Sequence, residues 1–137
     1  MDDAPLSPPE RIFSVEEANI LIPHLRALFL RIKTARSVLI RIGGEIRKAA
    51  AKMDVGGGSP YGGLYLQTLE DLSKSIQALQ ETGVLIKDLD SGLCDFPHRS
   101  DGRIVYLCWQ MGEEEIGWWH EIASGFQGRQ PLESLAT

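Results

Sequence analysis

The side chains best suited to chemistry in this sequence are a carboxylate, a thiol and an imidazole, those of Asp95, Cys108 and His120. These are ligand types that zinc prefers, and an acid–imidazole pair also serves general-base catalysis. The sequence holds no CxxC, HxxxH or HExxH motif, so spacing alone indicates no known metal site. The interpretation therefore depends on whether the fold brings the three side chains together.

Two hairpin turns would bring them together. If Asp101-Gly102 is a two-residue turn, Asp95 lies opposite Cys108; if residues 111–115 form the next loop, His120 lies opposite Tyr106. Side chains alternate along a strand. One face then carries Asp95, Tyr106, Cys108, Trp118 and His120, and the other Phe96, Leu107, Trp109 and Trp119.

Neighbouring residues extend this candidate site. Glu113 or Glu114 could supply a further ligand or act as a base on a metal-bound water. Arg129 is expected to clamp a carboxylate of the 113–115 loop, with anion binding as the alternative. The simpler interpretation makes Cys108 a buried apolar residue, His120 a core residue bonded to a carboxylate, and the glutamates a solvated loop tip.

The second cysteine has a different expected place. Cys94 pairs next to Trp109, on the face opposite Cys108, and residues on opposite faces cannot meet disulfide geometry. We therefore expect two free thiols. Two cysteines and an acidic, proline-containing N-terminus without an apolar run indicate a cytoplasmic protein with no membrane span.

Two helices are expected to precede the strands. Ser14 and Glu17 form a capping box, and apolar residues then recur every three or four positions up to Met53, with Pro23 inside the pattern. A turn at 56–63 leads to a second seam, which Gly83 ends; its members are Tyr65, Leu69, Leu72, Ile76 and Leu79. These features predict a long antiparallel helical hairpin with a coiled-coil-like seam.

After Gly83 the apolar period changes to two, which predicts three strands, at 84–90, 92–98 and 103–110. The expected fold class is α+β: a helical hairpin over 11–83, then a small antiparallel β-meander over 84–132. Residues 11–132 form one domain between disordered tails at 1–10 and 133–137. Unequal helix lengths and a sheet with two apolar faces both favour a homodimer.

Charge is uneven along the chain. The net charge is −5, yet residues 15–53 carry eight Lys or Arg against three acids. Five basic residues lie on neighbouring outer positions of the first helix: Arg26, Lys33, Arg41, Arg47 and Lys48. Because the whole chain is acidic, we expect no nucleic-acid partner, and keep such binding as the weakest alternative.

Several motifs are shared with a known family. The sequence reads FSVEEANILIP near its start, and GLCDFP, DGRIVYLCW, MGEEEIGWWH and GFQGRQPL near its end. With this order and spacing, the chain resembles a bacterial family named domain of unknown function 2203, over about residues 12–132. The resemblance implies no activity, because none is assigned to the family, and no catalytic residue can be transferred.

Three functions remain open at this point. The leading hypothesis is a homodimeric interaction or scaffold protein, not an enzyme, because no catalytic motif is recognised. The alternative is a metal- or ligand-binding protein, or an acid–base enzyme, that uses Asp95, Cys108 and His120, with His120 and Asp95 as the catalytic candidates and a divalent metal as the cofactor. The weaker alternative is nucleic-acid binding through the first helix.

Overall fold

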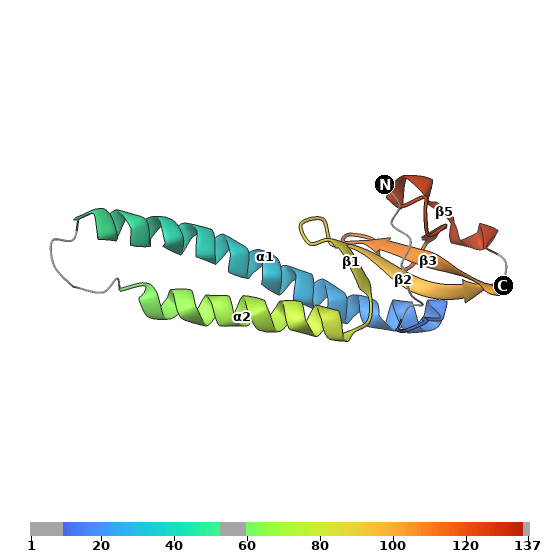
Figure 1. Ribbon diagram of the computed structural model, residues 1–137, viewed down its shortest axis with the longest axis horizontal. Coiled ribbons are helices and arrows are strands. Elements are labelled where there is room, and N and C mark those ends of the chain that lie inside the picture. The colour runs from blue at the N-terminus through green and yellow to red at the C-terminus, as the bar shows by residue number, and fades with distance from the viewer. Residues whose placement is uncertain (1–9, 53–59, 136–137) are drawn as a thin grey trace. The chain divides into compact units, whose positions relative to one another are not determined.

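The computed structural model describes residues 10–52 and 60–135 (Figure 1). The tail expected at 1–10 lies outside the described residues except for Glu10, and so does Met53 of the first seam. Two helices are followed by five strands, so the chain is α+β as predicted. It divides into two compact units. One combines the residues up to Ala27 with those from Leu79 onward, and the other is Leu28–Ala78.

The first helix begins where its capping box predicts. Helix α1 spans Val15–Lys52 and continues through Pro23. The Ser14 hydroxyl accepts a hydrogen bond from the Glu17 backbone N–H at 3.0 Å, and the Glu17 carboxylate accepts one from the Ser14 N–H at 2.8 Å. Each bond satisfies a backbone donor that the helix itself leaves unpaired.

The sheet-containing unit is an antiparallel meander. Its strands lie in the order β1 (Leu85–Asp88), β2 (Leu93–Ser100), β3 (Arg103–Gln110), β4 (Trp118–His120) and β5 (Gln130–Pro131). Asp101 and Gly102 both have positive φ, of 52° and 80°. That conformation gives the tight, twisted turn that an Asp-Gly pair favours between β2 and β3.

Both predicted registers are confirmed. Asp95 lies opposite Cys108, and Tyr106 lies opposite His120. Cys94 lies opposite Trp109, on the other face from Cys108, and both cysteines are free.

Strand β5 and the short helix at the end of the chain are not among the predicted elements. Two-residue β5 pairs with β4 and leads into a 3-10 helix, Leu132–Ser134. The Ser134 hydroxyl there accepts a hydrogen bond from the Trp119 ring at 3.0 Å. A segment that had been expected to be a tail from residue 133 is therefore attached to the sheet as far as Ser134; residues 136–137 are not described.

The start of α1 belongs to the sheet-containing unit (Figure 1). The Phe13 ring meets the Phe96 ring edge to face at 5.3 Å, and the side-chain amide oxygen of Asn19 accepts a hydrogen bond from the Ile116 backbone N–H at 2.7 Å. Ala18, Ile22 and Leu25 are buried within this unit. This part of the long helix is thus covered by the chain itself, so the unequal helix lengths do not require a second copy.

The Leu28–Ala78 unit contains the rest of α1 and most of α2, which spans Gly62–Glu81. Apart from Phe29, the buried positions of α1 here belong to the expected seam, and they are Leu28, Ile32, Ala35 and Ile42. The α2 seam is confirmed in part: Leu79 is buried and Tyr65, Leu72 and Ile76 are half-buried, whereas Leu69 is 40% exposed. Thr68 and Ser75, which the leucine spacing did not include, are also buried. The Thr68 hydroxyl can be buried because it donates to the carbonyl of Leu64 at 2.8 Å, one turn earlier.

The capping box gives a direct test of the helix start. Ser14→Ala removes one partner of the reciprocal pair, so the free energy of unfolding should fall by about 1 kcal/mol in urea titrations. Ser37→Ala, at an exposed position inside α1, is the control and should change stability by less than half of that. Equal losses in the two variants would contradict a capping role for Ser14.

Candidate metal centre

Asp95, Cys108 and His120 come together in the structure, one from each of the adjacent strands β2, β3 and β4. One potential ligand atom from each side chain lies within 4.8 Å of the other two. All three residues are buried, with exposures of 2%, 0% and 1%. The register and the alternation of side chains thus place an acid, a thiol and an imidazole in the interior.

Both nitrogens of the His120 ring are held by oxygen acceptors. Nε2 lies 2.9 Å from Asp95 Oδ1, and Nδ1 lies 2.6 Å from the backbone carbonyl oxygen of Glu121. A carbonyl oxygen can only accept, so Nδ1 carries a proton and donates it. The Glu121 carboxylate pairs with Arg103, and the Tyr106 ring lies edge-on to the imidazole at 5.5 Å. The ring is therefore fixed on several sides.

The protonation of His120 follows from these contacts. Burial disfavours the charged ring, but the hydrogen bonds to Asp95, Cys108 and the Glu121 carbonyl outweigh it and raise the pKa of His120 to about 10. An imidazolium with both N–H groups donating cannot accept a proton from a substrate at neutral pH. The catalytic role considered for His120 and Asp95 therefore gains no support from this geometry.

The cluster also has the ligand types of a metal site. A metal-bound histidine usually donates its other ring N–H to a carbonyl or carboxylate, as Nδ1 does here to Glu121. Zinc bonds of about 2.0–2.3 Å require ligand atoms roughly 3.3–3.6 Å apart in a tetrahedron, so separations of up to 4.8 Å would shrink by about 1 Å, while the 2.9 Å distance between Asp95 Oδ1 and His120 Nε2 would lengthen slightly. Side-chain rotation can provide that change without moving the strands.

Glu113, Glu114 and Arg129 are not part of the cluster formed by Asp95, Cys108 and His120. The Glu113 carboxylate accepts bonds at 2.8 Å from Arg129 and from the Gln110 backbone N–H. Neither Glu113 nor Glu114 belongs to the group of potential ligands found among the described residues. The expected pairing of Arg129 with an acid of the 113–115 loop is confirmed.

Arg129 also contacts strand β3, which carries Cys108. Its guanidinium donates to the Cys108 carbonyl at 3.3 Å and lies over the rings of Trp118 and Phe126, at 5.0 and 4.7 Å. Together with the buried Tyr106, Cys108 and His120, these contacts show that this sheet face is covered by the chain itself. Coverage of this sheet face therefore does not require a homodimer.

The five basic residues of the first helix do not form a single exposed surface. Arg26 donates a hydrogen bond to the Glu113 carbonyl at 3.2 Å, and Lys48 pairs with Glu45 at 3.7 Å. Lys33, Arg41 and Arg47 are exposed. No observation within the described residues adds to the nucleic-acid alternative.

The fold and this cluster define a small α+β protein with a candidate metal centre built across three strands. Residues 11–132 match the family described as "Uncharacterized conserved protein (DUF2203)", which is nearly the whole chain, and the protein belongs to that family. The resemblance found in the sequence is thereby confirmed. No curated protein and no solved structure gave a significant match. In the described residues, neither helix has a segment long and apolar enough to cross a membrane.

The raised pKa of His120 predicts how the metal-free protein responds to pH. Because the folded-state pKa, about 10, lies above the ordinary 6.5, the stabilisation is fully present below pH 6.5 and is lost as the pH rises towards 10. The free energy of unfolding should fall with a slope approaching about 1.4 kcal/mol per pH unit in urea titrations between pH 6 and 9. Asp95→Asn should flatten this dependence, and an unchanged slope in that variant would refute the assignment.

Proposed function

We propose that this protein binds a divalent transition metal through Asp95, Cys108 and His120, and that the preferred metal is zinc. The supporting observation is that one oxygen, one sulfur and one nitrogen ligand converge within 4.8 Å, with the second histidine nitrogen already bonded to a backbone carbonyl. A thiolate selects against magnesium and calcium, which prefer oxygen ligands. A mixed ligand set of this kind suits zinc.

The proposed metal has a structural role. The three ligands are at most 2% exposed, which favours a structural ion over a catalytic one that a substrate must reach. Their origin on β2, β3 and β4 means that one ion would cross-link three neighbouring strands. Three protein ligands leave one tetrahedral position for a small non-protein ligand such as water. A cytoplasmic location agrees with two free thiols and belongs to the same proposal.

Cobalt binding provides the sharpest test, because a cobalt–thiolate bond has a charge-transfer absorption that other ligands lack. The wild-type protein should bind one Co²⁺ with this absorption and release it to an equivalent of Zn²⁺. Cys108→Ser should abolish the absorption, and His120→Ala should weaken zinc binding at least about 100-fold.

The second cysteine supplies the matched control for that experiment. Cys94 is as buried as Cys108 but lies on the other face of the sheet. Burial raises the pKa of the Cys94 thiol, which keeps it protonated. Cys94→Ser should therefore bind cobalt as the wild type does. Loss of binding in the Cys94 variant, or binding by neither wild type nor variant, would exclude the proposed centre.

We also propose, as a second candidate function, a homodimeric scaffold built on the Leu28–Ala78 unit. Large apolar side chains remain exposed on both of its helices, and these are Leu30, Ile40, Leu64, Leu66 and Leu69. These side chains are available for contact with a second copy of the hairpin.

Light scattering tests self-association directly. The measured mass should rise from that of the 15.2 kDa chain to twice that value as the concentration increases through the micromolar range. Adding metal should leave this behaviour unchanged, because the hairpin unit contains none of the three ligands. A monomer mass at every concentration would exclude the scaffold role and would leave the metal proposal standing.

A further inference from the structure

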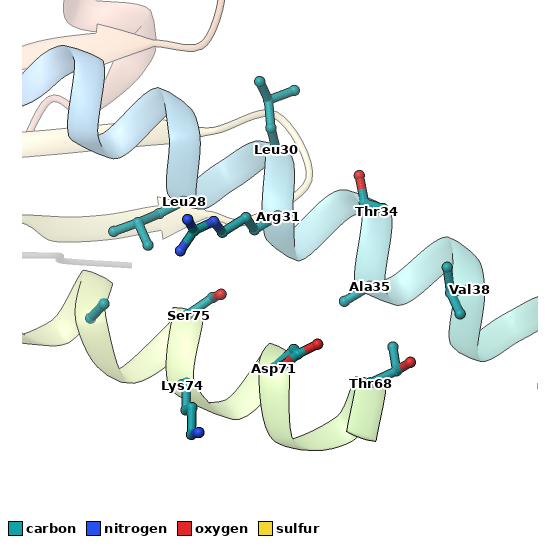
Figure 2. Close-up of a pocket in the computed structure, with 11 residues that line it drawn as sticks. Leu28, Leu30, Arg31, Thr34, Ala35, Val38, Thr68, Asp71, Lys74 and Ser75 are labelled. Carbon is teal, nitrogen blue, oxygen red and sulfur yellow. The ribbon is translucent and has the colours of Figure 1, made fainter. Parts of the chain in front are cut away.

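A groove runs between the two helices of the Leu28–Ala78 unit (Figure 2). It has a volume of about 630 Å³. Its lining from α1 includes Leu28, Ala35 and Val38, and its lining from α2 includes Thr68, Ser75 and Ala78. Four of these six side chains are as small as threonine or smaller, so the helices meet without filling the space between them.

The same unit has large apolar side chains that it does not bury. Leu30 lies at the groove and is 52% exposed, and Figure 2 shows it pointing away from α2. Ile40 and Leu66 are 74% and 67% exposed. Ile40 and Leu66 lie two residues from the groove-lining Val38 and Thr68 and therefore on the other side of their helices, so Leu30 is the large exposed side chain at the groove itself. The hollow seam and Leu30 beside it are the apolar features of this face that a second copy could cover. Packing large side chains of one helix into the spaces of another is the usual way in which helices associate.

Charge favours the same occupant. Between Leu28 and Lys52, α1 has seven Lys or Arg and one Glu, whereas the part of α2 in this unit, up to Ala78, has two acids and one Lys. Two copies related by a two-fold axis parallel to the helices would place each α1 over the partner's α2, basic helix on acidic helix. At the groove itself, Arg31 is on α1 and Asp71 is on α2.

We infer that this groove is the interface between two copies of the chain, with α1 of each copy seated over α2 of the other and Arg31 facing the partner's Asp71. The inference rests on the self-association proposed above and specifies its surface. A long arginine side chain reaches across a helical turn, so the pair forms without close contact of the two backbones. The result is a four-helix arrangement in which every helix has antiparallel neighbours.

A charge exchange between two variants tests this pairing. In the proposed dimer, residue 31 of each copy faces residue 71 of the other, and these are the two cross-contacts. In Arg31→Glu, both cross-contacts join two acids, and in Asp71→Arg both join two arginines. Each variant alone should dimerise at least about tenfold more weakly than the wild type in sedimentation experiments. In an equimolar mixture, the heterodimer joins the introduced glutamate of the first variant to the introduced arginine of the second. Its other cross-contact joins the unchanged Asp71 of the first variant to the unchanged Arg31 of the second, so dimerisation should return.

The mixture separates the interface from effects within one chain. If Arg31 and Asp71 act on each other only inside one hairpin, each variant keeps its own repulsion and mixing restores nothing. Filling the groove with Ala78→Leu gives an independent variant, which should fold as well as the wild type and dimerise at least about tenfold more weakly.

The outcomes distinguish the two proposals. A wild-type dimer that neither charge variant weakens would overturn the groove interface but keep the scaffold proposal. Weakened variants whose mixture stays monomeric would overturn the groove interface as well. A wild-type monomer at all concentrations would overturn both. Rescue in the mixture, at low salt and lost at high salt, is the result that the inference predicts.

Discussion

The buried Asp95–His120 pair is the constraint on which the sheet depends. Its 2.9 Å hydrogen bond joins two ionisable side chains that are at most 3% exposed, and an unpaired charge in that position would be strongly destabilising. A slip of one residue in either strand would send one partner to the opposite face among tryptophans and leucines. The pair thus selects the register of β2 against β3 and of β3 against β4, and the Glu121 carbonyl completes the hydrogen bonding of the ring.

The elements set by local chemistry could be predicted from the sequence. The capping box at Ser14 and the Asp101-Gly102 turn each fix a backbone geometry over a few residues, and the turn then determines every pair along β2 and β3. Strand β5 could not be found in this way, because two residues carry no periodicity and are ordered by contacts distant in sequence. The burial of Thr68 in the α2 contact could not be predicted for a related reason. The leucine spacing marks the apolar side of that helix, but Thr68 satisfies its own hydroxyl and can therefore replace a leucine at the contact.

Neither the unequal helix lengths nor the two apolar faces of the sheet require a second copy of the chain. In the structure, the early turns of α1 bury Ala18, Ile22 and Leu25 within the sheet-containing unit, and Arg129 and its neighbours lie against the thiol-bearing face. In the Leu28–Ala78 unit, exposed leucines remain and the seam is hollow. The proposed self-association is therefore argued from side-chain sizes within the hairpin rather than from helix lengths or from the number of sheet faces.

The charges around the candidate metal centre decide which ion it would suit. A divalent ion held by the Asp95 carboxylate, a Cys108 thiolate and a neutral His120 would be balanced by its two anionic ligands, and the nearby Arg129–Glu113 pair is balanced in itself. The same cluster without metal places an imidazolium against a carboxylate, which is also balanced. A buried site that is neutral in both states can exchange protons for a metal ion without leaving a net charge in a low-dielectric interior. A monovalent cation would leave a net negative charge and a trivalent one a net positive charge, so burial itself favours a divalent ion.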